Sequence, residues 1–160
     1  MGSTLIITSV EALQKEINQL LSNRKEEWGI YLSLNKSQKS AAEAFSKAGI
    51  GTDRLFFIDC VATQQARRDV LHFKPTELEQ VEYAVKMYID EIPGRKFVLV
   101  DALSTLLIYN DVNKVAKFVK EVTEFADGKD VSVFAFTPKT QGEELLQKIY
   151  NFFDEVKGKK

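Results

Sequence analysis

The stretch Phe97-Val98-Leu99-Val100-Asp101 consists of four apolar residues that end in an aspartate. A short apolar run of this kind is typical of a strand with both faces buried, as in a parallel sheet. Pro93-Gly94 ends a helical pattern before the run, and another helical pattern follows it toward Gly128. The sequence around Asp101 therefore predicts a buried strand between two helices.

The same alternation of apolar run and helical pattern occurs about five times along the chain. The other runs span residues 5–7, 28–34, 55–58 and 131–136. This rhythm predicts an α/β fold, a three-layer αβα sandwich with a mainly parallel five-stranded sheet. No linker or internal repeat divides the sequence, so we expect residues 1–160 to form a single domain. The last helix is expected to bury Leu145, Ile149, Phe152 and Val156.

Local signals predict where several helices begin and end. Thr8 is expected to cap the first helix, with Glu11 three residues later reaching back to it. Thr76 and Glu79 form the same capping pattern at the start of the third helix. Gly49 is expected to end the second helix, because glycine adopts the left-handed conformation without steric cost.

Composition excludes several classes of protein. The 160 residues include 22 basic and 23 acidic side chains, which gives a net charge of -1. Nucleic-acid binders usually present a strongly basic face, so we expect no nucleic-acid binding. The longest apolar stretches, at residues 97–100 and 106–109, are far shorter than the roughly 20 residues of a membrane span. A single cysteine, Cys60, and no signal-peptide pattern predict a cytoplasmic protein.

Candidate binding residues lie where the predicted strands end. In open parallel sheets, ligands bind beyond the carboxyl ends of the strands, near the point where the strand order reverses. An aspartate at a strand end can also simply cap the following turn, so both roles stay open for Asp101. The candidate site comprises Asn35, Lys36, Asp59, Asp101 and Thr137.

Four segments together resemble a known superfamily in their order and spacing. They span residues 28–34, residues 48–50 with 55–59, residues 74–78, and residues 98–111. The chain is similar to the KaiC and RecA superfamily of ATPases, especially the KaiC-like proteins common in archaea. The last segment resembles the Walker B strand and its following loop, which implies a RecA-like P-loop NTPase fold with Asp101 at the magnesium-holding position.

Two departures from that superfamily bear on catalysis. The phosphate-binding motif G-x-x-x-x-G-K-S/T is absent, and only Thr8-Ser9-Val10-Glu11 follows the first run. Glu11 would repel a phosphate at the helix start. The paired glutamates that the resemblance implies after the second strand are replaced by Asn35 and Lys36, which are poor bases. We therefore expect no ATP hydrolysis, no catalytic residue, no cofactor and no bound nucleotide.

The remaining candidates each allow a plain structural interpretation. His72 has no neighbour at metal-ligand spacing, so we expect a solvated loop residue and no metal site. Cys60 is interpreted as a buried thiol, because no nucleophile signature surrounds it. The polar stretch 61–74 is expected to be mobile, either a lid or an idle loop. Leu106-Leu107-Ile108-Tyr109 is either a partner surface or a covered helix.

Two functions follow from these observations. The first is a non-catalytic interaction or regulatory module that associates with itself or with an active ATPase. The alternative is a protein that binds a nucleotide or small anion, or an enzyme, through the strand ends. In that alternative, Lys36 and Lys139 would meet the anion.

Overall fold

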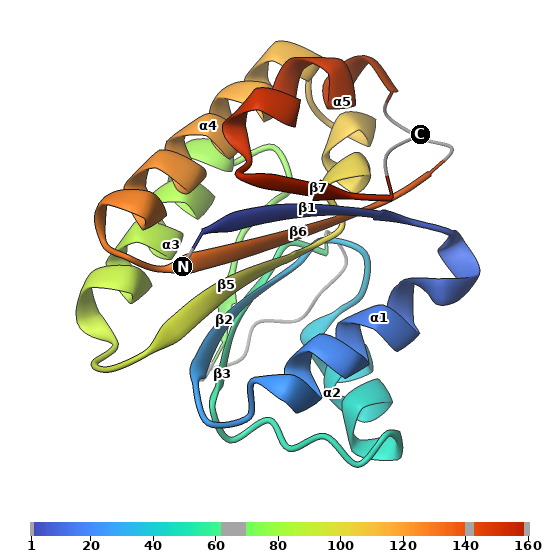
Figure 1. Cartoon of the computed structure of the whole chain (residues 1–160), viewed down its shortest axis with the longest axis vertical. Helices are drawn as coiled ribbons and strands as arrows, with labels where there is room; N and C mark the ends of the chain where they lie inside the picture. Colours follow the sequence, from blue (N-terminus) through green and yellow to red (C-terminus); the bar gives the residue numbers. More distant parts are fainter. Residues whose placement is uncertain (1, 62–69, 140–142, 159–160) are drawn as a thin grey trace.

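A single parallel sheet forms the centre of the molecule (Figure 1). The computed structural model describes residues 2–61, 70–139 and 143–158. The sheet has seven strands in the order β4-β3-β2-β5-β6-β1-β7, and every neighbouring pair is parallel. The strands are β1 (Ser3–Thr8), β2 (Trp28–Ser33), β3 (Leu55–Asp59), β4 (Leu71–His72), β5 (Lys96–Asp101), β6 (Ser132–Pro138) and β7 (Glu155–Lys157).

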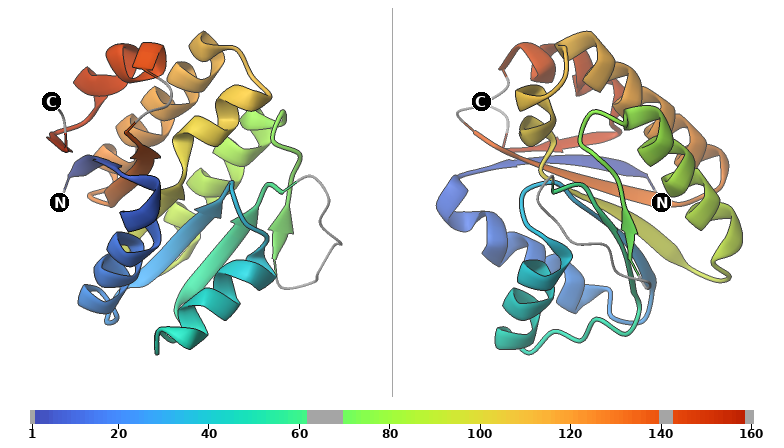
Figure 2. Two further views of the ribbon diagram at one scale, coloured as in Figure 1. Left: turned by 90° about the vertical axis from the view of Figure 1, so that its right-hand side faces the viewer. Right: turned by 180° about the vertical axis from the view of Figure 1, so that it is seen from behind.

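Helices cover both faces of the sheet, which confirms the α/β fold class (Figures 1 and 2). The helices α1 (Val10–Asn23) and α2 (Gln38–Lys47) lie on one face. The other face carries α3 (Leu78–Glu91), α4 (Val112–Gly128) and α5 (Glu143–Ile149). Two short 3-10 helices, η1 (Leu103–Ile108) and η2 (Tyr150–Phe152), follow β5 and α5. No helix among the described residues is long and apolar enough to cross a membrane.

The central strand β5 shows why the deciding run is apolar throughout. Phe97 and Leu99 pack into the core beneath α1 and α2, whereas Val98 and Val100 pack beneath α3 and α4. Successive side chains of a strand point to opposite faces, so both sets are buried only when helices cover both faces. All four side chains are at most 3% exposed. The uninterrupted apolar run therefore reflects the burial of β5 on both faces of the sheet.

The sheet is wider than predicted because each edge carries a short strand. At one edge, Glu155–Lys157 forms β7 beside β1, with Val156 opposite Leu5. The prediction that Val156 lies in the last helix is wrong, because α5 ends at Ile149 and the chain then returns to cover the edge of β1. At the other edge, β4 lies within the stretch 61–74 that was expected to be irregular. Residues 62–69 of that stretch lie outside the described residues, so the lid interpretation stays a prediction.

The ends of the helices differ in part from the capping predictions. Ser9 caps α1 in place of Thr8, with its hydroxyl accepting from the Ala12 amide at 3.2 Å. Thr8 is still part of β1, and its hydroxyl donates to Glu16. The α2 helix ends as predicted, with Gly49 at a φ of 77°.

The predicted capping box of the third helix is also wrong. The α3 helix begins only at Leu78, after Thr76, and has no side-chain cap. The Glu77 carboxylate instead accepts from the Lys74 amide at 2.7 Å and holds the turn before the helix. Pairing within this turn takes the place of the expected Thr76–Glu79 pair.

Candidate functional site

Asp101 occupies the centre of the carboxyl edge of the sheet. Its strand β5 lies between β2 and β6, and Asp101 is in register with Ser33 on one side and Phe136 on the other. The side chain is 1% exposed. The predicted strand end at Asp101 is confirmed, and the structure places this strand in the middle of the sheet.

The Asp101 carboxylate is held by two side chains of the protein. The Tyr31 hydroxyl, from β2, donates to one oxygen at 2.6 Å, and the Asn35 amide donates to the other at 3.1 Å. The Thr105 hydroxyl, from η1, donates in turn to the Asn35 carbonyl oxygen. A hydrogen-bonded chain thus runs from Thr105 through Asn35 and Asp101 to Tyr31. Such networks fix side-chain positions when every member is satisfied.

Burial controls the protonation of this pair. Loss of solvent raises the pKa of Asp101 above its ordinary value, and the hydrogen bond from Tyr31 and the charge of Lys36 only partly oppose that rise. Burial also raises the pKa of Tyr31 well above 10.0, and the neighbouring Asp101 charge and hydrogen bond raise it further. Tyr31 therefore stays protonated and donates a hydrogen bond to the Asp101 carboxyl group.

Lys36 connects the loop after β2 to helix α1. Its ammonium donates to the side-chain carbonyl of Gln14, and its own backbone carbonyl accepts from the Ser33 hydroxyl. These bonds hold the charge beside α1. Lys36 is close enough to Asp101 to affect the pKa of that carboxyl, but it makes no hydrogen bond to it.

Asp59 lies at the end of β3, apart from the Asp101 network. Its carboxylate accepts from the Gln38 amide at 2.7 Å and from the Val61 amide at 2.9 Å, and the side chain is fully buried. Asp59 thus ties the start of α2 to the chain that follows β3. Thr137, also predicted, lies buried at the end of β6. The structure therefore joins Asp101 to Asn35 directly but leaves Asp59 in a separate cluster.

His72 lies in β4 beside Asp59, so its assignment to a solvated loop is wrong. The ring is 17% exposed, and its Nδ1 lies 4.0 Å from an Asp59 oxygen. Register places the two residues opposite each other on neighbouring strands. Among the described residues, no group of three or more His, Cys, Asp or Glu side chains could hold a metal ion.

Comparison with known proteins adds a family and two solved structures. The model of a family of unknown function, DUF7504, matches residues 2–156. The chain belongs to DUF7504. Comparison with curated proteins yields no match.

Two of the solved structures similar to this DUF7504 chain come from Pyrococcus horikoshii. The KaiC-like protein PH0186 has a TM-score of 0.69 and 8% identity, over 97% of this chain and 69% of the other. The uncharacterized protein PH0321, solved in complex with an unknown peptide, has a TM-score of 0.72 and 13% identity, over 97% of this chain and 76% of the other. At these identities the likeness shows the fold, which agrees with the predicted resemblance.

Two further predictions for this DUF7504 chain concern Cys60 and the segment after Asp101. Cys60 is buried, and burial together with the charges of Asp59 and Glu77 raises its pKa to about 12, so it stays a protonated thiol as interpreted. In η1, Leu106 is fully buried, whereas Ile108 is 73% and Tyr109 is 47% exposed. The segment is therefore core at one end and surface at the other.

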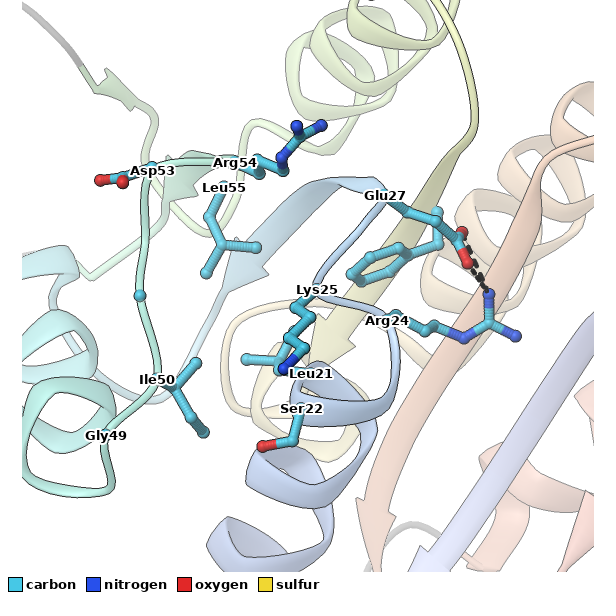
Figure 3. Close-up of a pocket in the computed structure, with 12 residues that line it drawn as sticks. Leu21, Ser22, Arg24, Lys25, Glu27, Gly49, Ile50, Asp53, Arg54 and Leu55 are labelled. Carbon is cyan, nitrogen blue, oxygen red and sulfur yellow. Dashed lines mark hydrogen bonds and ion pairs between the residues drawn. The ribbon is translucent and has the colours of Figure 1, made fainter.

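The amino edge of the sheet holds a hollow that the sequence analysis did not identify (Figure 3). It measures about 300 Å³ and lies where the end of α1 faces the connection between α2 and β3. Its lining comes from residues 21–27 and 49–55, together with Phe97. In the sequence, residues 48–50 and 55 stand out only as a helix end, a strand and part of the superfamily resemblance, and the lining residues come together through the order of the strands.

Proposed function

We propose that this chain is a non-catalytic domain of KaiC/RecA-like fold that binds a protein partner or a second copy of itself. In this proposal it does not hydrolyse ATP. The observation that carries the proposal is that the carboxyl edge of the sheet is filled by the protein's own hydrogen bonds. The central pair is Asp101 with Tyr31 at 2.6 Å.

The start of α1 does not fit a nucleotide triphosphate. A P-loop surrounds the phosphates with backbone amides and a lysine at this point. Here only Ser9 separates β1 from α1, and its hydroxyl already accepts from the Ala12 amide. Glu11 lies in the first turn and Glu16 accepts from Thr8, so carboxylates lie where an anion would have to bind.

The Asp101 network supports the same conclusion about hydrolysis. A magnesium-holding aspartate offers its carboxylate oxygens to the ion, whereas here burial raises the pKa of Asp101 and each of its oxygens already accepts a hydrogen bond, from Tyr31 or Asn35. Asn35 cannot take a proton from water, and Lys36 is tied to Gln14. Neither Asn35 nor Lys36, which stand where the paired glutamates are expected, is therefore suited to activate an attacking water.

The exposed end of η1 supports a binding role. Ile108 and Tyr109 are exposed, while Leu106 anchors the same short helix in the core. An apolar pair held on an anchored segment favours contact with another protein over solvent. The PH0321 structure, of similar fold, holds a peptide. It supports peptide or protein binding as a property that this fold can carry.

The first test measures turnover and association of the purified chain. We expect no magnesium-dependent release of phosphate from ATP, and an oligomer in light scattering after size exclusion. Ile108→Ser with Tyr109→Ser should dissociate the oligomer. Val10→Ser, which changes an equally exposed apolar residue on α1, is the matched control and should leave the oligomer intact.

Two results would contradict the proposal. ATP turnover that Asp101→Ala abolishes would show an active ATPase. A rise in melting temperature with a nucleotide or inorganic phosphate, lost in Lys36→Gln or Lys139→Gln, would favour the alternative of an anion-binding protein, because a ligand of the native state must stabilise it.

A further inference from the structure

The hollow at the amino edge has an apolar floor. Leu21 and Phe97 are 4% and 2% exposed, and Leu55 and Ile50 complete the lining on the side of β3. Its volume of about 300 Å³ is at the lower end of the range for small-molecule pockets. At roughly 30 Å³ for a water-sized group, it admits on the order of ten non-hydrogen atoms.

The walls of the hollow are held in place by contacts outside it. At the end of α1, the Arg24 guanidinium donates to both Glu27 oxygens, at 3.1 and 2.9 Å, and lies 4.5 Å from the Phe134 ring centroid. On the opposite side, the Ile50 amide donates to the Phe45 carbonyl at 2.8 Å. The hollow is therefore formed before any ligand arrives, which lowers the entropic cost of binding.

Gly29 explains why the floor is closely packed. A Cβ atom at this position would lie 2.7 Å from Leu55 and 2.7 Å from Phe97. The absence of a side chain lets these two residues meet above β2. A larger residue at position 29 would push Leu55 and Phe97 out of place, so Gly29 keeps the floor of the hollow in its present form.

The charges around the hollow leave one cation without an internal partner. The rim carries Arg24, Lys25 and Arg54 against Glu27 and Asp53. Arg24 is paired with Glu27, and Arg54 lies 4.9 Å from the Trp28 ring centroid. Figure 3 shows the Arg54 and Asp53 side chains directed away from the hollow.

Lys25 differs from the other charges on the rim. Figure 3 shows its side chain lying along the hollow on the side of Ser22. It makes no side-chain hydrogen bond or ion pair to any residue within 2–61, 70–139 or 143–158. An ammonium group and a hydroxyl beside an apolar floor match a carboxylate that carries an apolar body.

We propose that this hollow binds a small organic acid. The apolar body would lie against Leu21, Leu55 and Phe97, and the carboxylate would accept from Lys25 and Ser22. The site lies at the edge of the sheet opposite Asp101 and does not depend on the function proposed above.

The test is a titration of the full chain with hexanoate, followed by amide NMR shifts. Hexanol and hexylamine, of the same length, test the need for a negative charge. We expect hexanoate to shift signals of residues 21–25 and 49–55, and the two other probes to bind at least about tenfold more weakly. Lys25→Gln should weaken hexanoate binding about tenfold, the effect of losing one charge-assisted hydrogen bond.

A filling variant tests the location. Gly51 lines the hollow, and a Cβ there meets no atom within 4 Å, so Gly51→Trp should abolish binding and leave the fold intact. Gly128→Trp, at an equally open glycine at the end of α4, is the matched control and should bind normally. The proposal is wrong if hexanoate shifts none of these signals, if hexylamine binds as well, or if both Lys25→Gln and Gly51→Trp bind like wild type.

Discussion

The two edges of the sheet use their polar groups in opposite ways. At the carboxyl edge, Asp101 is buried and both its oxygens accept hydrogen bonds from side chains of the protein. At the amino edge, Lys25 borders an apolar hollow and has no side-chain partner among the described residues. Ligands of parallel sheets usually bind at the carboxyl edge. Here the polar groups at the favoured carboxyl edge already bind one another, whereas the amino edge has an open hollow with Lys25 beside it.

This contrast shows that the position of a polar residue does not make it a binding group. A buried carboxylate with donors at 2.6 and 3.1 Å already accepts one hydrogen bond on each oxygen, and a ligand would have to compete with those bonds. A cation beside an apolar hollow gives up water but no protein hydrogen bond when a ligand binds. The contrast predicts that substitutions at the carboxyl edge change stability, whereas those at the amino edge change binding.

The largest expected effect is that of Asp101→Ala. The substitution leaves the buried Tyr31 hydroxyl and the Asn35 amide without their acceptor, so the free energy of unfolding should fall by about 2 to 3 kcal/mol. Urea denaturation followed by circular dichroism measures this. Asp101→Asn keeps one acceptor oxygen and is the matched control with a smaller loss. Equal losses in the two variants would show that the carboxylate's hydrogen bonds to Tyr31 and Asn35 do not account for its contribution to stability.

Tyr31→Phe should have the next largest effect. It keeps the ring in the core, with Phe45 at 5.4 Å between centroids, and removes only the hydroxyl that donates to Asp101. The buried carboxyl then lacks one donor, and we expect a loss of about 1 to 2 kcal/mol. Tyr88→Phe, at a tyrosine that is only partly buried, should cost less in the same assay. If the Tyr31 variant is as stable as wild type, the Tyr31–Asp101 bond contributes nothing.

The titration of Asp101 predicts a smaller, pH-dependent effect. Because burial raises its pKa in the folded protein above the ordinary 3.8, the unfolded chain releases this proton at a lower pH than the native protein does. Its stabilising contribution is therefore present below that value and lost as the pH rises through the folded pKa. The stability of Asp101→Asn relative to wild type should increase from acid pH to neutral. A difference that stays constant with pH would show an unshifted carboxyl.

Glu27→Gln tests the wall of the hollow and should cost little. The Arg24–Glu27 pair is partly exposed, and pairs of this kind are worth about 0.2 to 1 kcal/mol. Arg24 keeps its contact with the Phe134 ring, so the end of α1 should stay in place. Thermal unfolding at low and high salt measures the effect, which should shrink with added salt. If Glu27→Gln lowered the free energy of unfolding as much as Asp101→Ala, the two edges of the sheet would not differ in how much their polar groups stabilise the fold.

Lys25→Gln should have the smallest effect on stability. The side chain has no partner to lose among the described residues, so the melting temperature should stay unchanged. Differential scanning calorimetry without added acid measures it. A clear fall would show that Lys25 has a structural role, and its proposed role in binding would then need the separate evidence of the hexanoate titration.

The main strands were predictable because each is long enough to show its pattern. The residues 97–101 form β5 as predicted, and Gly49 ends its helix as predicted. The edge strands β4 and β7 were missed because two or three residues cannot display a periodicity. The misplaced first cap has a similar cause, since Thr8 and Ser9 are adjacent and both belong to residue types that cap helices.

The candidate site was predictable in place but not in its bonds. Strand ends indicated that Asp101 and Asn35 would lie on one edge, and they do. Tyr31 was not predicted as their partner, because an aromatic residue inside an apolar run looks like ordinary core. The hollow beside Lys25 was not predicted, because no pattern links residues 21–27 with residues 49–55, which meet only after the strands have assembled.

The place of β1 in the sheet has a consequence for synthesis. Ser3 lies beside Val133 and Leu5 beside Val156, so β1 pairs with β6 and β7, which are synthesised after β2, β3 and β5. While the chain emerges from the ribosome, β2, β3 and β5 can already pair with one another, whereas β1 lacks its partners β6 and β7. Pairings between such distant segments slow folding and leave apolar strands open to aggregation in the meantime. Residues 3–23, which form β1 and α1, are therefore the part of the nascent chain that most needs a chaperone.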